Sequence, residues 1–251
     1  MPAYRRFPRS LLLLAVFALP ASAAEFTVSA AASLGEAFAE IAERFEAAHP
    51  DHEVRLNFGA SGALLQQVRA GAPVDVFASA DSETMDRAAA EGLVDAARRH
   101  DFAGNALVVA VPADATDLPA DLAALAGPQI RRIALGQPDS VPAGRYAREA
   151  LQAADLWDAL SPRLIPAQNV RQALDYVARG EVDAAFVYAT DLAAQPGRVL
   201  RAFDVPLSAP IRYPIAAVAD SREPEAAVAF VRFVLSDEGQ AVLRRHGFLA
   251  P

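Results

Sequence analysis

The stretch Gly136-Gln137-Pro138-Asp139-Ser140-Val141-Pro142-Ala143-Gly144-Arg145-Tyr146 decides how the rest of the chain is interpreted. It follows an apolar run at 133–135 and precedes a helical pattern of apolar residues, so it predicts a loop between a strand and a helix. Such a loop presents unpaired backbone N–H groups at a helix N-terminus, where an anion is stabilised. Ala143 and Gly144 carry no reactive side chain, so the loop indicates binding rather than catalysis.

The same order of strand, loop and helix recurs along the chain. Strands are expected at 25–31, 54–58, 74–80, 107–111, 130–135, 164–166, 184–187 and 211–219. Alternation of strands with helices predicts an α/β fold with mostly parallel sheets. Ser33, Ser61, Ala143 and Val170 each follow a strand and precede a helix. Loops in this position lie beyond the carboxyl ends of parallel strands, which is where α/β sheets bind ligands.

Residues 1–24 have the composition of a secretory signal peptide. Three arginines between positions 5 and 9 precede the apolar run 11–19, and the small residues 21–24 fit a cleavage site. The alternative is a membrane anchor, but the apolar run is shorter than the roughly 20 residues that a spanning helix needs. We therefore expect residues 1–24 to be removed and the mature protein to be exported to the periplasm.

Composition limits the remaining possibilities. A chain of 251 residues fits one large domain or two small ones. It has no cysteine, which excludes disulfides and thiolate chemistry. Removing the signal peptide takes away three arginines and no acid, so the formal net charge moves from −8 to −11. Nucleic acid is therefore not an expected partner, and an anionic ligand must be held by local dipoles and hydrogen bonds.

Three side chains with hydroxyl groups stand at these loops or at a strand end. Ser33 and Glu36 have the spacing of a capping box, and a capping hydroxyl can still donate its own proton outward. Tyr188 ends a buried-looking strand, where its hydroxyl needs a partner. Ser61 can be a helix cap like Ser33, and its surroundings also leave a catalytic alternative open.

That alternative is a serine hydrolase. Gly59, Ser61 and Ala63 follow a strand in a pattern that resembles the nucleophile elbow, although the motif has glycine where Ala63 stands. A catalytic triad would also need a histidine, and only His100 and His246 lie downstream. The pattern therefore supports a hydrolase only weakly.

Taken together, these segments resemble the periplasmic molybdate-binding proteins of ABC transporters. The matching stretches are Ala31–Leu34, Gly59–Gly62, Val74–Asp81, Gly104–Val108, Gly136–Tyr146, Asn169–Arg171 and Val187–Asp191. They follow one another in order over nearly the whole mature chain. The Val-Pro-Ala-Gly-x-Tyr-Ala and Val-Tyr-Ala-Thr-Asp stretches are the most specific.

The resemblance implies a two-lobed type II periplasmic-binding-protein fold. Each lobe would be a mostly parallel sheet flanked by helices, with the ligand in the cleft between the lobes. We assign residues 25–106 plus 217–251 to lobe 1 and residues 107–216 to lobe 2. Ser33 and Ser61 then lie on lobe 1, while Ala143, Val170 and Tyr188 lie on lobe 2.

The resemblance also implies the ligand, which would be molybdate or tungstate. The hydroxyls of Ser33, Ser61 and Tyr188 and the backbone N–H groups of Ser33, Ser61, Ala143 and Val170 would hold its oxygens, without direct ligation of the metal. The protein would be a monomer without enzymatic activity or cofactor, and its partner would be an ABC permease in the inner membrane. Alternatives are a protein of the same fold for another oxyanion such as sulfate, or the Ser61 hydrolase.

Overall fold

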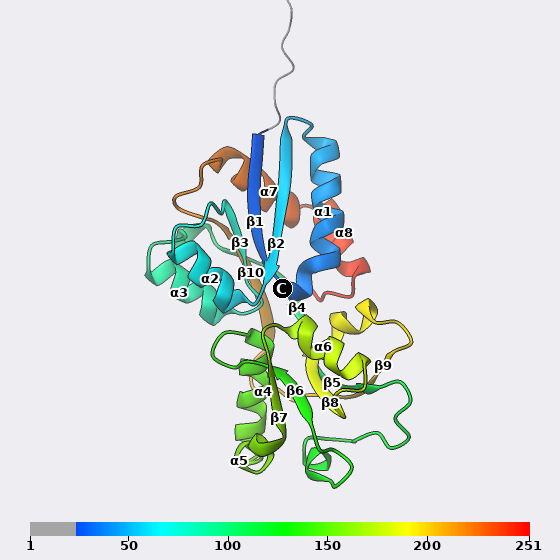
Figure 1. Cartoon of the computed structure of the whole chain (residues 1–251). Helices are drawn as coiled ribbons and strands as arrows, with labels where there is room; N and C mark the ends of the chain where they lie inside the picture. Colours follow the sequence, from blue (N-terminus) through cyan, green and yellow to red (C-terminus); the bar gives the residue numbers. More distant parts are fainter. Residues whose placement is uncertain (1–23) are drawn as a thin grey trace, which may run out of the picture.

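A computed structural model describes residues 24–251, so nearly all of the expected signal peptide lies outside the described residues. The described chain forms two lobes, each built on a five-stranded sheet with flanking helices (Figure 1). This architecture confirms the expected α/β, two-lobed fold. No helix within residues 24–251 has both the length and the apolar character that crossing a membrane requires.

The first lobe contains both ends of the described chain. Its sheet has the strand order β2-β1-β3-β10-β4. The strands are β1 (Ala24–Ala31), β2 (His52–Gly59), β3 (Val76–Ala78), β4 (His100–Asn105) and β10 (Ile211–Ala217). The helices are α1 (Gly35–Ala48), α2 (Ser61–Arg69), α3 (Ser82–Ala90), α7 (Pro224–Leu235) and α8 (Asp237–Arg245), with short 3-10 helices η1 (Ala32–Leu34) and η2 (Ala96–Arg98).

The second lobe repeats this layout, with the strand order β7-β6-β8-β5-β9. Its strands are β5 (Leu107–Pro112), β6 (Ile133–Gly136), β7 (Leu164–Ala167), β8 (Ala184–Tyr188) and β9 (Val199–Asp204). Its helices are α4 (Pro142–Ala153), α5 (Trp157–Leu160) and α6 (Val170–Ala178), with the 3-10 helices η3 (Ala123–Ala126), η4 (Ser161–Arg163) and η5 (Ala189–Ala194).

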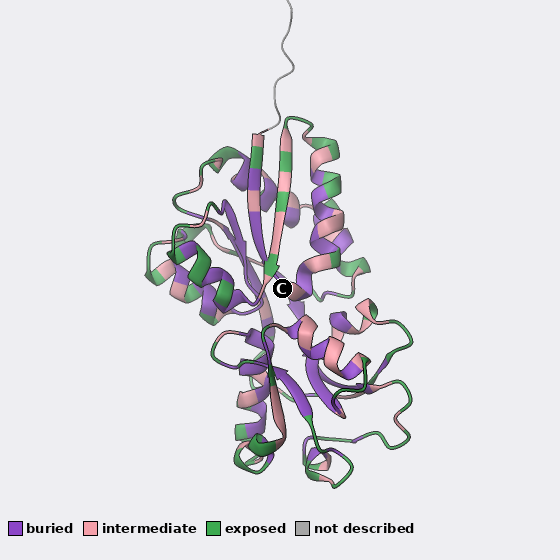
Figure 2. Ribbon diagram, in the orientation of Figure 1, coloured by how far each residue is buried: buried purple, intermediate pink, exposed green. Residues whose placement is uncertain are grey.

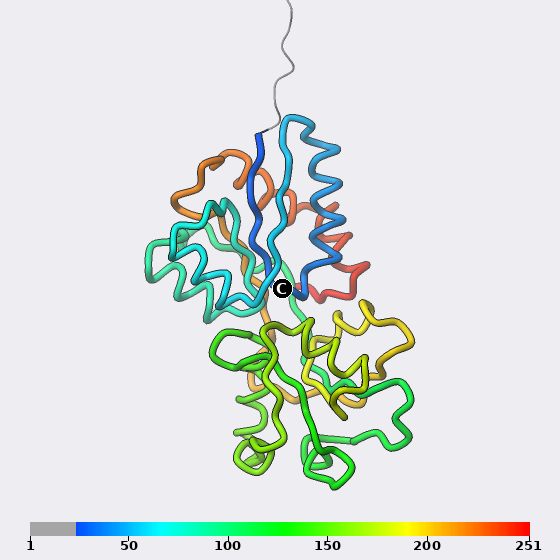
Figure 3. Tube along the Cα trace, in the orientation of Figure 1, coloured from blue at the N-terminus to red at the C-terminus, as the bar shows by residue number. Residues whose placement is uncertain are grey.

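One strand of each sheet runs against its neighbours. β10 is antiparallel to β3 and β4, and β5 is antiparallel to β8 and β9, while β1, β2 and β3 are mutually parallel, as are β6, β7 and β8. The cause is the path of the chain, which passes from lobe 1 to lobe 2 before β5 and returns before β10 (Figure 3). Each crossing reaches the next sheet at the C-terminal ends of its parallel strands. The strand that enters there must therefore run antiparallel to them.

The second lobe boundary differs from the expected one. Lobe 2 was expected to extend to residue 216, but Ile211 pairs with Asn105 and Ile215 pairs with Ala78, both in the first sheet. Lobe 1 therefore resumes at Ile211 rather than at residue 217. An apolar strand fits either sheet equally well by its sequence, so only its pairing decides which lobe it joins. The other boundary falls where β5 begins, at Leu107.

Alternating side chains of the first sheet fill two cores, one on each face. Val76 and Ala78 of β3 belong to the core that includes α1 and α7, whereas Phe77 between them belongs to the core under α2 and α3. Successive side chains of a strand point to opposite faces, so a sheet that is covered on both sides reads as a continuous apolar run. Figure 2 shows the buried residues concentrated on the sheets and on the inner sides of the helices.

Candidate functional site

A small cavity lies between the lobes, where parallel strands of both sheets end. The volume open to a water-sized sphere is about 10 Å³. Residues from both lobes line it: Ala31, Ala32, Ser33, Gly59, Ala60, Ser61, Ala80, Val141, Pro142, Ala143, Asn169, Val170 and Tyr188. The structure thus brings together all five residues singled out in the sequence, Ser33, Ser61, Ala143, Val170 and Tyr188. Their role as ligand contacts stays a prediction.

Three helices of the two lobes begin at this cavity. Ser61 starts α2, Ala143 is the second residue of α4, and Val170 starts α6. N–H groups in the first turn of a helix have no acceptor within that helix, and the positive end of the helix dipole lies there. Pro142 has no N–H to leave unpaired, and Asn169 caps α6 by accepting from the N–H of Gln172 at 3.0 Å. The wall is therefore rich in backbone donors.

The expected capping box at Ser33 is wrong. Ser33 lies inside the 3-10 helix η1, whose N-cap is Ala31, and no side chain caps that turn. The Ser33 Oγ atom is instead 3.0 Å from the hydroxyl of Tyr213, and Glu36 forms an ion pair with Arg171 of the other lobe. Both side chains of the expected capping box therefore contact residues from distant segments instead of each other's backbone. The Ser33 hydroxyl lies at the cavity wall.

The hydroxyl of Ser61 has a fixed orientation. Its Oγ accepts from the backbone N–H of Ala80 at 3.0 Å, so its own proton is available to the cavity. No histidine is among the residues that line the cavity, and His246 contacts Glu40 through Nε2 at 2.9 Å. Within the described residues, Ser61 therefore has no general base, and the hydrolase alternative finds no support.

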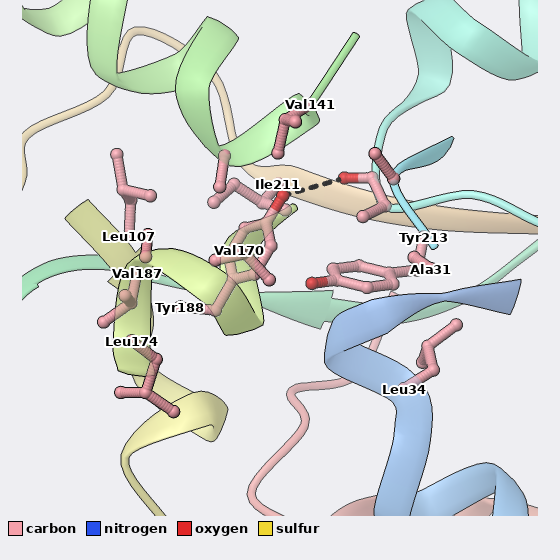
Figure 4. Close-up of a cluster of buried hydrophobic side chains, with 14 of the residues drawn as sticks. Ala31, Leu34, Leu107, Val141, Val170, Leu174, Val187, Tyr188, Ile211 and Tyr213 are labelled. Carbon is pink, nitrogen blue, oxygen red and sulfur yellow. Dashed lines mark hydrogen bonds between the residues drawn. The ribbon is translucent and has the colours of Figure 1, made fainter. Parts of the chain in front are cut away.

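Tyr188 contributes the third hydroxyl. The residue is 1% exposed, and its hydroxyl donates to the carbonyl of Ala80 over a long 3.5 Å, the dashed line in Figure 4. Burial raises the pKa of Tyr188 well above its usual value, so the phenol keeps its proton. A bond of this length is weak, and a better acceptor in the cavity can replace it.

Two arginines of lobe 2 form ion pairs with lobe 1 next to the cavity, and sequence analysis found none of these pairs. Arg145 of α4 pairs with Asp81, the N-cap of α3, and both side chains are buried at 6% and 3% exposure. The Nε atom of Arg145 is also 3.0 Å from Oε2 of Glu83 in α3. Arg171 of α6 pairs with Glu36 of α1. Residues this far apart in sequence carry no signal that would pair them. Among residues 24–251, no group of three or more His, Cys, Asp and Glu side chains could hold a metal ion.

Asp191 contacts Arg171, the arginine that pairs with Glu36. It is completely buried, its Oδ2 accepts from the backbone N–H of Tyr188 at 2.9 Å, and its Oδ1 is 3.0 Å from Nε of Arg171. Burial raises the pKa of Asp191 to about 6, although the Arg171 guanidinium opposes that shift. The folded state therefore binds the proton of Asp191 more tightly than the unfolded state does.

We expect this proton to make the stability depend on pH. The contribution of Asp191 is fully present below pH ~4, the value for an unfolded aspartate, and is lost as the pH rises through about 6. Relative to Asp191→Asn, which keeps an acceptor for Tyr188, the wild type should lose on the order of 2–3 kcal/mol across this window. Urea unfolding of both proteins at several pH values measures the difference.

The contributions of the other carboxylates to the pH dependence of stability are the same in the wild type and in Asp191→Asn, so they cancel in the difference. Hydrogen bonds from His246 and Arg245 lower the pKa of Glu40 to about 2, for example, and this group is the same in both proteins. Parallel curves for the wild type and Asp191→Asn would show that the pKa of Asp191 is the same in the folded and the unfolded state.

Comparisons with known proteins agree with the fold and the cavity. A family model described as "Bacterial extracellular solute-binding protein" matches residues 26–249. The molybdate-binding protein ModA of Escherichia coli is 37% identical over 232 residues, 89% of this chain and 88% of that protein. A putative ABC transporter substrate-binding lipoprotein of Bacillus subtilis, YvgL, is 35% identical over 225 residues, 89% of this chain and 86% of that one.

Solved structures of solute-binding proteins have the same fold. The periplasmic molybdate-binding protein of Azotobacter vinelandii superposes with a TM-score of 0.80 and 26% identity, covering 90% of this chain and 99% of that one. The sulfate-binding protein SubI of Mycobacterium tuberculosis superposes with a TM-score of 0.81 at 20% identity, over 90% of this chain and 86% of its own, and shares the fold. Such relatives bind substrates without transforming them, which confirms the interpretation that the chain is not an enzyme. The chain belongs to the bacterial extracellular solute-binding proteins.

Proposed function

We propose that this protein binds molybdate, and tungstate as its near equivalent, and delivers it to an ABC permease. The observation that carries the proposal is a cavity walled by hydroxyls and first-turn N–H groups from both lobes. Relatives named as molybdate-binding proteins support the choice of ligand. In this proposal Ser33, Ser61, Ala143, Val170 and Tyr188 contact the oxygens of the anion, and none of them ligates the metal.

A cavity wall in which donors predominate favours a fully ionised oxyanion. Molybdate, tungstate and sulfate dianions accept hydrogen bonds at every oxygen and donate none. Hydrogenphosphate carries a proton that would face the protons of Ser33 and Ser61. A buried polar group without a partner costs roughly 1–3 kcal/mol, so we expect phosphate to be rejected.

Sulfate is the second candidate, because it has the same charge and shape as molybdate and the fold is shared with a sulfate-binding protein. It is the smaller anion, so the two must be told apart by the size of the closed cavity. Identity to the proteins named for molybdate favours molybdate.

The cellular setting is part of the proposal. The basic and apolar segments of residues 1–24 support export to the periplasm, although nearly all of them lie outside the described residues. The protein would work as a monomer, with the oxyanion as its only ligand, no cofactor, and the permease in the inner membrane as its partner.

Calorimetric titration of the mature protein with molybdate, tungstate, sulfate and phosphate tests the proposal. We expect tight one-to-one binding of the first two anions and no heat from phosphate. Tight binding of sulfate with weak binding of molybdate would transfer the proposal to sulfate. The absence of binding heat with all four anions would reject the proposal.

The buried ion pair between the lobes gives a further prediction. Arg145→Met removes the cation that pairs with Asp81 and Glu83 of the other lobe, and breaking a buried pair such as Arg145–Asp81 costs about 3–5 kcal/mol. Opening the lobes hydrates Asp81, so most of this cost falls on the closed, binding-competent state. We expect the apparent affinity for molybdate to fall at least about tenfold. Arg148→Met, on the same helix but 33% exposed in its side chain, is the control; equal affinities in both variants would mean that the pair does not hold the lobes together.

A further inference from the structure

A chain of hydrogen bonds leads from the crossing between the lobes to the hydroxyl of Ser33. Asn105 is the last residue of β4, directly before the chain enters lobe 2, and Tyr213 lies in β10. Asn105 Nδ2 is 3.3 Å from Tyr213 Oη, and Tyr213 Oη is 3.0 Å from Ser33 Oγ. All three residues are buried. Figure 4 shows Tyr213 beside Tyr188, the other tyrosine of this region.

The direction of these hydrogen bonds is fixed at one end by a backbone N–H, which can only donate. The N–H of Ala106 donates to Oδ1 of Asn105 at 2.9 Å, so the amide of Asn105 cannot be turned around. Its Nδ2 therefore faces Thr190 Oγ1 at 2.9 Å and Tyr213 Oη, and donates to both.

Tyr213 passes this direction on to Ser33. Its oxygen accepts from Asn105, and of its two hydrogen-bond partners among the described residues only Ser33 Oγ can accept, so we assign the phenol proton of Tyr213 to Ser33 Oγ. Burial raises the pKa of Tyr213 well above the usual value, so the phenol keeps that proton. Ser33 Oγ then accepts from Tyr213 and has its own proton left for the cavity, which it lines. The N–H of Ala80 imposes the same direction on Ser61.

We propose that Tyr213 and Asn105 are positioning residues that hold the Ser33 hydroxyl as a donor and so make the site select fully ionised oxyanions over protonated ones. This inference rests on the proposed function. A serine that can rotate offers a lone pair to the proton of hydrogenphosphate. Ser33 is held back from this role because Tyr213 donates to one of the two lone pairs of Ser33 Oγ, which directs the Ser33 proton, rather than a free lone pair, into the cavity.

Tyr213→Phe is the direct test. Phenylalanine keeps the edge-on ring contacts with Phe102, Tyr188 and Phe248 and removes only the hydroxyl. We expect molybdate affinity to fall about tenfold, whereas binding of hydrogenphosphate, measured at mildly alkaline pH, stays equal or rises. The ratio of the two affinities therefore falls. An equal loss for both anions would mean that Tyr213 has only a structural role. Tyr176→Phe, in α6 away from this chain of bonds, should change neither affinity.

A double-mutant cycle with Ser33→Ala tests the path through Ser33. If Tyr213 acts through the Ser33 hydroxyl, Tyr213→Phe has no further effect on molybdate affinity once Ser33 is alanine. Additive losses would overturn the inference. If the wild type prefers sulfate, the proposed ligand is wrong, and the same cycle is run with sulfate, which is equally ionised. A wild type that binds molybdate tightly while Tyr213→Phe leaves affinity and selectivity unchanged would overturn only the role of Tyr213.

Discussion

Replacing Ser61 with alanine is expected to weaken molybdate binding by between about tenfold and a hundredfold. The Ser61 proton points into the cavity because Ala80 N–H occupies a lone pair of its oxygen at 3.0 Å. A hydrogen bond to a charged group contributes roughly 1.5–3 kcal/mol, and each 1.4 kcal/mol is about a factor of ten in affinity. Calorimetric titration of the wild type and Ser61→Ala measures the loss.

The same substitution leaves the buried N–H of Ala80 without its acceptor, so some loss of stability is expected as well. Thermal melting without ligand separates this effect from the loss of binding. Ser82→Ala, at the start of α3 and outside the cavity wall, is the matched control and should bind normally. If Ser61→Ala binds molybdate like the wild type, the Ser61 hydroxyl serves only to hold Ala80.

Gly144→Ala is expected to destabilise the protein by about 3 kcal/mol or more. A Cβ atom at this position would lie 1.8 Å from the carbonyl oxygen of Gly136 and 2.6 Å from its carbonyl carbon. Both obstacles are backbone atoms, so no change of rotamer relieves the contact. The start of α4 would have to move away from the end of β6, and it would carry the N–H of Ala143 with it. Urea unfolding and molybdate titration should therefore both show a loss.

Gly35→Ala is the matched control for this prediction. Gly35 is also at the start of a helix, has right-handed helical dihedral angles, and has open space where a Cβ would lie. We expect its stability to be unchanged or slightly raised, because alanine favours the helix. A wild-type unfolding curve for Gly144→Ala would mean that the close approach of α4 to β6 is not needed.

Most of the fold could be predicted because its inner strands are continuous apolar runs between loops rich in glycine and proline. Two strands escaped this reasoning, β4 (His100–Asn105) and β9 (Val199–Asp204). Both end their sheets, and both mix charged with apolar residues, as an edge strand with one solvated side does. Their sequences therefore lack the signal that marked the central strands. The place of β10 was missed for a different reason, because pairing between distant strands leaves no local pattern.

In the candidate site, too, the features set by local sequence could be predicted, and those set by contacts between distant residues could not. The positions of Ser61, Ala143 and Val170 follow from strand, loop and helix order, which short sequence windows contain. The contacts that orient or connect these residues do not follow from short sequence windows. Tyr213 lies 180 residues from the serine that it contacts, and Arg145 lies 64 residues from Asp81. The capping box at Ser33 failed because its spacing describes an isolated helix start, whereas Tyr213 and Arg171 compete for both of its side chains.

The place of β10 also determines which half of the molecule can be completed first as the chain emerges. All strands of the second sheet lie in one continuous stretch, from Leu107 to Asp204. The first sheet holds the earliest residues, yet β10 separates β3 from β4 in it. The half that is synthesised first is therefore finished last. A chain that crosses a membrane beginning at its N-terminus would keep that half open until Ile211–Ala217 had followed it across.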